Sequence, residues 1–249
     1  MKKLVLVGLV LALSGGSVGA SVAKGRAIYS ATALAHKKQF EAGLAAYNSG
    51  DFETAVGIWA PLAEQGVGSA QGNLGFMYLN GLGVLQDYVA AASWYRKAAD
   101  LGEAEAQVSL GFMYEKGQGF LPQDYAAAAS LYRKAADQGN ASAQSNLGAD
   151  YEIGQGVSQD YAAAAIWYRK AADQDDTKAQ FKLGALYYSG QGVPQDFVQA
   201  HRWFNLAAAG ASDSEVRKRA ATNRDAVAAK MTPAQVAEAQ RLASEWRKK

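Results

Sequence analysis

The chain has 249 residues, of which 49% are hydrophobic and 19% charged, and it contains no cysteine. Without cysteine there are no disulfides, so packing of apolar side chains has to stabilise the fold. The formal net charge of +2 gives no indication of nucleic-acid binding. Abundant alanine and only four prolines predict an all-helical protein.

The first twenty residues have the pattern of a signal peptide. Lys2 and Lys3 precede an apolar run over 4–13, and small residues follow up to Ala20. The run is too short to cross a hydrocarbon core, which needs about 20 apolar residues. We expect cleavage after Ala20, a linker over 21–36, and a periplasmic or secreted protein with no membrane span after cleavage. Without its two leading lysines the chain has 23 basic and 23 acidic residues.

Two short motifs then recur four times at almost constant spacing. The first is Leu74-Gly75, Leu110-Gly111, Leu147-Gly148 and Leu183-Gly184. The second is Gln86-Asp87-Tyr88, Gln123-Asp124-Tyr125, Gln159-Asp160-Tyr161 and Gln195-Asp196-Phe197. Each interval is 36 or 37 residues. A fixed period of this size indicates an array of supersecondary units that bury their apolar faces against their neighbours.

The repeat over 70–102 predicts two helices joined by a glycine turn. Ala70, Leu74 and Met77 fall on one helical stripe, and Gly75 on that stripe allows a close approach by the next helix. The glycines of the turn 80–83 suit a helix C-terminus, and Asp87 is placed to cap the second helix.

The array extends beyond the four good copies. A degenerate copy precedes them, so that the predicted array covers 37–212. Residues 213–249 read as two capping helices, the second starting with a capping box at Thr232. This C-terminal segment has nine basic and five acidic residues. It is either a solvated terminal face or a site for an anionic polymer or lipid.

The repeated pattern resembles a known family. Ala-x-x-x-Leu-Gly-x-x-Tyr, then Gly-x-Gly-Val-x-Gln-Asp-Tyr, then Trp-Tyr-x-Lys-Ala-Ala is similar to the Sel1-like repeat, a relative of the tetratricopeptide repeat. The resemblance implies a right-handed α-solenoid of stacked antiparallel helix pairs, with the first helices lining a concave groove. It also implies a scaffold or adaptor role. One branch of the family is disulfide-rich and associated with β-lactams, and the lack of cysteine leaves transfer of that activity unsupported.

The sequence offers no recognisable catalytic, cofactor or metal site. His36 and His201 have neither an i+4 histidine nor a cysteine partner, so metal-ligand spacing is absent. The Gly-x-Gly turns follow helices and lack the Gly-Lys-Ser/Thr ending of a phosphate loop. Glu115 and Glu152 occupy equivalent repeat positions, and solvated groove charges explain them better than a catalytic pair.

By analogy with tetratricopeptide geometry, certain first-helix positions face the concave groove. The candidate partner-binding residues at these positions are Phe40, Leu44, Tyr47, Phe76, Leu79, Phe112, Glu115, Phe181 and Tyr188. Aromatic side chains on a solvent-facing surface are suited to binding a peptide or a helix. Two interpretations are open: these residues bind a partner, or they pack between repeats.

The sequence therefore predicts an exported, non-catalytic scaffold that binds a protein or peptide in its groove and needs no cofactor. The alternative is a cell-envelope enzyme or small-ligand binder acting on cell-wall or β-lactam-like substrates. The identity of the partner and the oligomeric state do not follow from the sequence.

Overall fold

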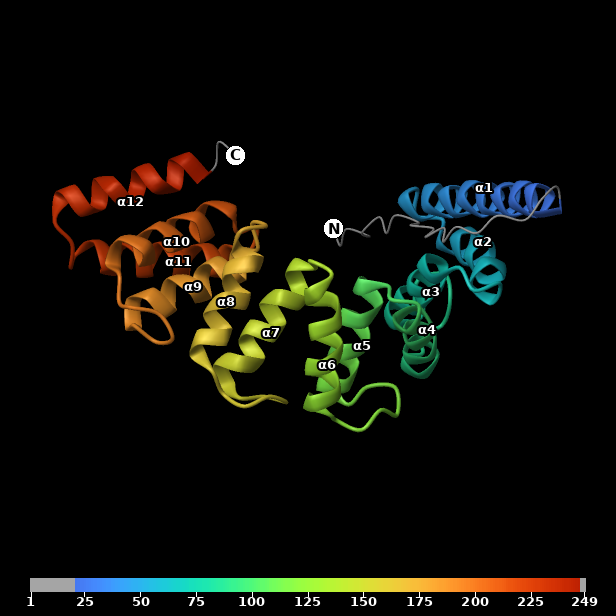
Figure 1. Ribbon diagram of the computed structural model, residues 1–249, viewed down its shortest axis with the longest axis horizontal. Helices are drawn as coiled ribbons and strands as arrows, with labels where there is room; N and C mark the ends of the chain where they lie inside the picture. The colour runs from blue at the N-terminus through green and yellow to red at the C-terminus, as the bar shows by residue number, and fades with distance from the viewer. Residues whose placement is uncertain (1–20, 247–249) are drawn as a thin grey trace. The chain divides into compact units, whose positions relative to one another are not determined.

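The computed structural model describes residues 21–246, with side chains from residue 32 onward, and within this range it has helices and no strand (Figure 1). The helices are α1 (Ser21–Asn48), α2 (Phe52–Glu64), α3 (Gly68–Asn80), α4 (Tyr88–Asp100), α5 (Ala104–Lys116), α6 (Tyr125–Asp137), α7 (Ala141–Ile153), α8 (Tyr161–Ala172), α9 (Thr177–Ser189), α10 (Phe197–Gly210), α11 (Ser214–Ala228) and α12 (Pro233–Trp246).

The chain divides into two compact units, one ending at Gln123 and the other starting at Asp124. In the first unit, helices α1 to α5 pack in chain order, and α3 also touches α5. In the second unit, α6 to α11 pack in chain order, α12 packs on α10, and α9 touches both α7 and α11. The predicted all-α fold of stacked helix pairs is confirmed.

The N-terminal predictions have different outcomes. Residues 1–20, the predicted signal peptide, lie outside the described residues. Residues 21–36, expected as a linker, form the first half of α1. The segment has no proline, so the helix over 37–48 can propagate backward through it. Within the described part of the chain, none of the helices is both long and apolar enough to cross a membrane.

The glycines of three Leu-Gly motifs, Gly75, Gly148 and Gly184, allow close contact between the two helices of a pair. A Cβ atom on Gly75 would lie 2.7 Å from Cδ1 of Tyr95, and one on Gly148 would lie 2.7 Å from Cδ1 of Tyr168. The close approach predicted for Gly75 is therefore confirmed.

The Gln-Asp-Tyr motif joins the two helices of each repeat. The Asp87 carboxylate accepts hydrogen bonds from the backbone N–H groups of Val89 and Ala90, which caps α4 as predicted. The preceding Gln86 donates from Nε2 to the carbonyl oxygen of Leu79 at 2.9 Å, which satisfies a free carbonyl at the end of α3. Equivalent bonds occur in the other three copies.

The turn after each first helix carries glycines with left-handed backbone. Gly154 and Gly156 have φ of 73° and 69°, and a Cβ atom on Gly156 would lie 2.0 Å from the carbonyl oxygen of Tyr125. The turn therefore packs on the start of an earlier second helix, and a side chain at Gly156 would overlap with backbone. These glycines end helices and serve packing, as the sequence indicated.

Asp175 adopts the left-handed conformation that glycines adopt at equivalent places. Its φ is 64°, against 92° for Gly102 and Gly139. The Trp246 indole N–H donates to the Asp175 carboxylate at 3.2 Å, so the aspartate also holds the last helix.

The core of each unit lies between first and second helices. Trp59, Leu74 and Met77 are fully buried in the first unit, and Leu183, Trp203 and Phe204 in the second. Trp167 is buried and Trp94 is half-buried against its cluster, so the tryptophan rings lie within the packing as expected.

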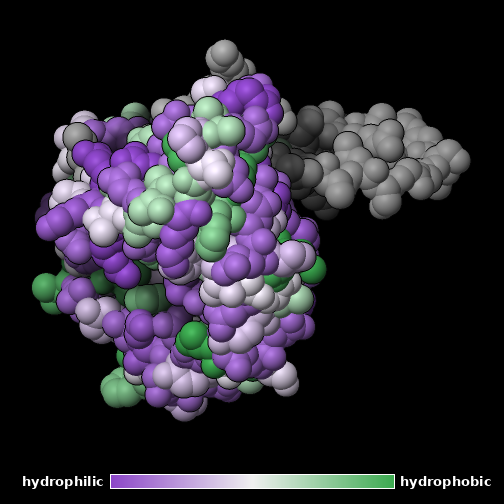
Figure 2. Space-filling view, turned by 90° about the vertical axis from the view of Figure 1, so that its left-hand side faces the viewer, coloured by the Kyte–Doolittle hydropathy of each residue, from purple (hydrophilic) through white to green (hydrophobic). Residues whose placement is uncertain are grey.

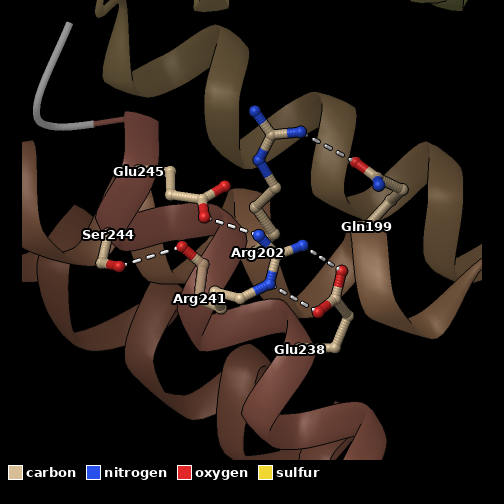
Figure 3. A network of polar contacts seen from close by, with 6 residues as sticks. All are labelled: Gln199, Arg202, Glu238, Arg241, Ser244 and Glu245. Carbon is tan, nitrogen blue, oxygen red and sulfur yellow. Dashed lines mark hydrogen bonds and ion pairs between the residues drawn. The ribbon is translucent and has the colours of Figure 1, made fainter.

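The C-terminal helices α11 and α12 cover α10. The Trp246 ring packs edge-on against that of Trp203 at 5.5 Å between centroids. The guanidinium of Arg202 lies over both rings. Figure 3 shows that Arg202 also donates to Gln199, while Arg241 on α12 pairs with Glu238 and Glu245 on its own helix. The capping box predicted at Thr232 is confirmed by its bonds with Gln235.

Candidate binding surfaces on the first helices

In the first unit, four candidate residues pack against the core and keep part of their surface in water. Phe40, Leu44, Tyr47 and Phe76 are half-buried against the cluster that contains Trp59. The Tyr47 ring lies 6.1 Å from the Trp59 ring and 6.3 Å from the Phe76 ring, between centroids. These side chains therefore pack between α1, α2 and α3, and each keeps part of its surface in water.

Phe112 on α5 is the most exposed of the candidate aromatic residues. Its side chain is 44% exposed, and the Lys116 ammonium lies 5.3 Å from its ring centroid. It occupies the same repeat position as Phe76 on α3, two residues after the motif leucine. Because α3 and α5 touch, the two phenylalanines lie on neighbouring helices of one unit.

Leu79 and Glu115 are half-buried near the C-terminal ends of α3 and α5. Glu115 forms an ion pair with Lys116 at 2.6 Å. In the second unit, Glu152 accepts from the Tyr168 hydroxyl at 2.5 Å and from Lys182 at 3.0 Å. Burial, followed by the hydrogen bond to Glu152, raises the pKa of Tyr168. Each glutamate therefore forms an ion pair with a lysine, which is consistent with a structural role.

In the second unit, Phe181 and Tyr188 lie on α9 beneath α11 and the segment that follows it. The Phe181 ring packs 5.4 Å from that of Phe204. Tyr188 packs 5.8 Å from Phe197 and accepts a hydrogen bond from Lys230 at 2.5 Å. The C-terminal segment therefore covers part of the predicted surface at this end.

A pocket of about 240 Å³ lies between α9 and α11. It is lined by Lys178, Phe181, Lys182, Val216 and Arg219. Phe181 is one of the groove candidates from the sequence, and Lys178 lies three residues before it on α9. Val216 and Arg219 were not among the candidate residues, because residues 213–249 were predicted only as two capping helices and a basic segment, either a solvated face or a site for an anionic polymer or lipid, and none of them was placed beside the first helices. Figure 2 shows this end of the molecule, where hydrophilic residues predominate and hydrophobic ones lie in small separate groups.

The two histidines differ in their surroundings: His36 contacts a glutamine and His201 is buried. The His36 ring nitrogen Nε2 lies 2.9 Å from the side-chain oxygen of Gln65. His201 on α10 is 3% exposed, and burial and the charge of Arg224 lower its pKa. Among the described residues, histidine, cysteine, aspartate and glutamate form no group of three that could hold a metal ion.

Comparison with solved structures shows which proteins share this fold. A Sel1 repeat protein from Oxalobacter formigenes is 30% identical with a TM-score of 0.66, and the match covers 78% of this chain and 86% of that one. The second is c5321, a protective antigen of uropathogenic Escherichia coli strains with an SLR fold. It is 31% identical with a TM-score of 0.54, and the match covers 88% of this chain and 55% of c5321. The comparison with curated proteins gave no match.

The Sel1 repeat family model matches four consecutive segments, 68–103, 104–140, 141–176 and 177–212. These segments contain the four copies of the Leu-Gly and Gln-Asp motifs, and together they make up more than half of the chain. The chain therefore belongs to the Sel1 repeat family.

Proposed function

We propose that this protein is an exported, non-catalytic scaffold that binds a protein or peptide on the surface of its first helices. The Sel1-repeat fold is typical of protein-interaction scaffolds. The observation that supports the proposal most is the pair Phe76 and Phe112, which leaves aromatic surface in water at the same position of two neighbouring helices. Exposed aromatic side chains on a rigid helical surface are the usual anchors of a binding interface.

The rival proposal is an envelope enzyme or small-ligand binder, and the geometry supports it less. A nucleophile needs a base within hydrogen-bond reach, and the two repeat carboxylates discussed above are bound to lysines. The pocket of about 240 Å³ is also smaller than the roughly 300–1,000 Å³ of typical small-molecule sites. Turnover of a chromogenic β-lactam by the pure protein would favour the rival.

The binding proposal is tested with a displayed library of random peptides selected on the purified chain. The Phe76→Ser, Phe112→Ser double variant should bind the selected peptides at least tenfold more weakly, because a central aromatic anchor contributes about 2 kcal/mol or more. Phe112→Ser alone, at the more exposed site, should give a smaller loss without disturbing the fold.

A matched control replaces two exposed apolar residues elsewhere, Leu85 in the α3–α4 turn and Ile166 on α8, which are 91% and 58% exposed. The Leu85→Ser, Ile166→Ser variant should keep wild-type affinity. Equal affinity of all variants, with unchanged helical circular dichroism, would refute the assignment of the surface. Export is tested separately: the protein recovered from the periplasm or medium should begin at Ser21.

A further inference from the structure

The pocket between α9 and α11 combines an apolar floor with a cationic rim. Phe181 and Val216 supply the apolar side chains, and the floor continues into the buried alanines Ala207, Ala208 and Ala220. Lys178 and Lys182 are one helical turn apart on α9, and Arg219 faces them from α11. Three cations from two helices therefore surround one hydrophobic depression.

This positive charge is only partly compensated among the described residues. Lys182 forms an ion pair with Glu152 at 3.0 Å. Neither Lys178 nor Arg219 forms an ion pair within the described residues, and the Arg219 guanidinium lies over the Phe181 ring at 5.4 Å. The Asp213 carboxylate accepts hydrogen bonds from the backbone N–H groups of α11, which it caps, and these bonds, together with the charge of Lys178, lower its pKa. Lys178 is therefore partly compensated by Asp213, whereas Arg219 has no carboxylate in ion-pair contact among the described residues; both cations still line the pocket.

The size and chemistry of the pocket select the ligand. A volume of about 240 Å³ holds one apolar side chain rather than a drug-sized molecule. A free inorganic anion would leave the hydrophobic floor in water. An apolar side chain with carboxylates beside it would cover the floor and also form ion pairs with the cations of the rim.

We infer that this pocket binds an acidic peptide segment, with one large apolar side chain on Phe181 and Val216 and flanking carboxylates on Lys178 and Arg219. The inference rests on the proposed function, because it names the chemistry of a partner that binds a first helix, α9, in the second unit. It adds α11 to the binding surface, so the helix that closes the repeat array also contributes to recognition.

The test uses the full chain and an N-acetylated, C-amidated peptide in which one leucine is flanked by glutamates on both sides. Replacing the glutamates with glutamine should weaken binding at least tenfold, and replacing the leucine with serine should weaken it about tenfold. Because the ion pairs are exposed to solvent, raising the salt concentration should also weaken binding.

Lys178→Gln, Arg219→Gln should lose at least tenfold in affinity for the glutamate peptide, and Lys178→Arg, Arg219→Lys should retain it. The matched control is Lys218→Gln, which removes a charge from α11 outside the pocket lining and should stay within twofold of wild type. Val216→Asp, which places a carboxylate at the floor, should abolish binding even if the rim variants fold poorly.

Three results would overturn the inference: equal binding of the glutamine peptide, an equal loss in Lys218→Gln, or binding only to vesicles of anionic phospholipid. If library peptides still bound through Phe76 and Phe112 in any of these cases, the proposed function would stand and only this pocket would be reassigned.

Discussion

At the scale of single residues, the packing of the repeat depends on positions where only glycine fits. Gly148 lies against the Tyr168 ring, which is 1% exposed and tethered through its hydroxyl to Glu152. Gly72 also lies inside a first helix, but a Cβ atom there would meet nothing within 4 Å. Replacing each glycine with alanine therefore gives the same gain in helix propensity, but only the replacement at Gly148 disturbs the packing between helices.

Gly148→Ala should lower the free energy of unfolding by up to about 2 kcal/mol. The added methyl group forces the Tyr168 ring to move, at a cost of about 1–3 kcal/mol, which offsets or exceeds the gain of roughly 1 kcal/mol from replacing glycine in a helix. Gly72→Ala should raise stability by about 0.5–1 kcal/mol. Urea denaturation measures both, and an equal gain in both variants would show that the close approach at Gly148 is not constraining.

Four buried glutamines share one structural role, a hydrogen bond to the end of the preceding helix. Gln71, Gln107, Gln144 and Gln180 each donate from Nε2 to a carbonyl oxygen eight residues earlier, near the end of the preceding second helix. A free carbonyl in the core would cost about 1–3 kcal/mol, so these bonds close each junction between repeats. These glutamines recur at intervals of 36, 37 and 36 residues, in step with the Leu-Gly motif, and this recurrence is the signal in the sequence that could have identified them.

At the scale of helices, the junction between α10 and α11 contains the one buried histidine among the described residues. His201 occupies the position of Ala92, Ala129 and Ala165 in the earlier repeats, and its Nδ1 has no hydrogen-bond partner. Burial first, and then the Arg224 charge, lower its pKa, while Asp225 opposes them.

The pKa of His201 is thus lower in the folded protein than its ordinary value of 6.5, so the unfolded chain binds the proton more readily. Stability from this group is complete above about pH 6.5 and decreases as the pH falls through the folded pKa. Between pH 7.5 and 5.5, the wild type should therefore lose more stability than His201→Ala in urea denaturation. Identical pH dependence of the two proteins would contradict this.

At the scale of the whole molecule, the sequence predicted what is local and repeated. Helix pairs, the Asp87 cap, the Gly75 approach and the Thr232 capping box all depend on residues a few positions apart or on a neighbouring copy. The pocket at Phe181 was missed because it depends on where α11 packs, and no repeat period specifies that contact. The helical state of 21–36 was missed for a related reason, since those residues lie outside the period.

The first and second helices of the repeats differ in the aromatic surface that they expose, and this difference predicts where a partner binds. In the second helices, Tyr95, Tyr132 and Trp203 are buried in the core, and the exposed tyrosines Tyr88 and Tyr125 are the first residues of their helices.

On the first helices, Phe76 and Phe112 keep aromatic surface in water within the body of the helix. A partner should therefore contact first helices. The expectation applies to the first unit, because in the second unit the C-terminal segment covers part of the first-helix surface at Phe181 and Tyr188.

Amide hydrogen exchange of the full chain, alone and with a peptide selected on it, tests this expectation most directly. Binding should add protection in α3 and α5, where local opening becomes coupled to release of the peptide. The second helix α4, in the same unit, serves as the internal control and should change little. Added protection confined to second helices such as α4 and α8, with α3 and α5 unchanged, would contradict binding on the first-helix surface.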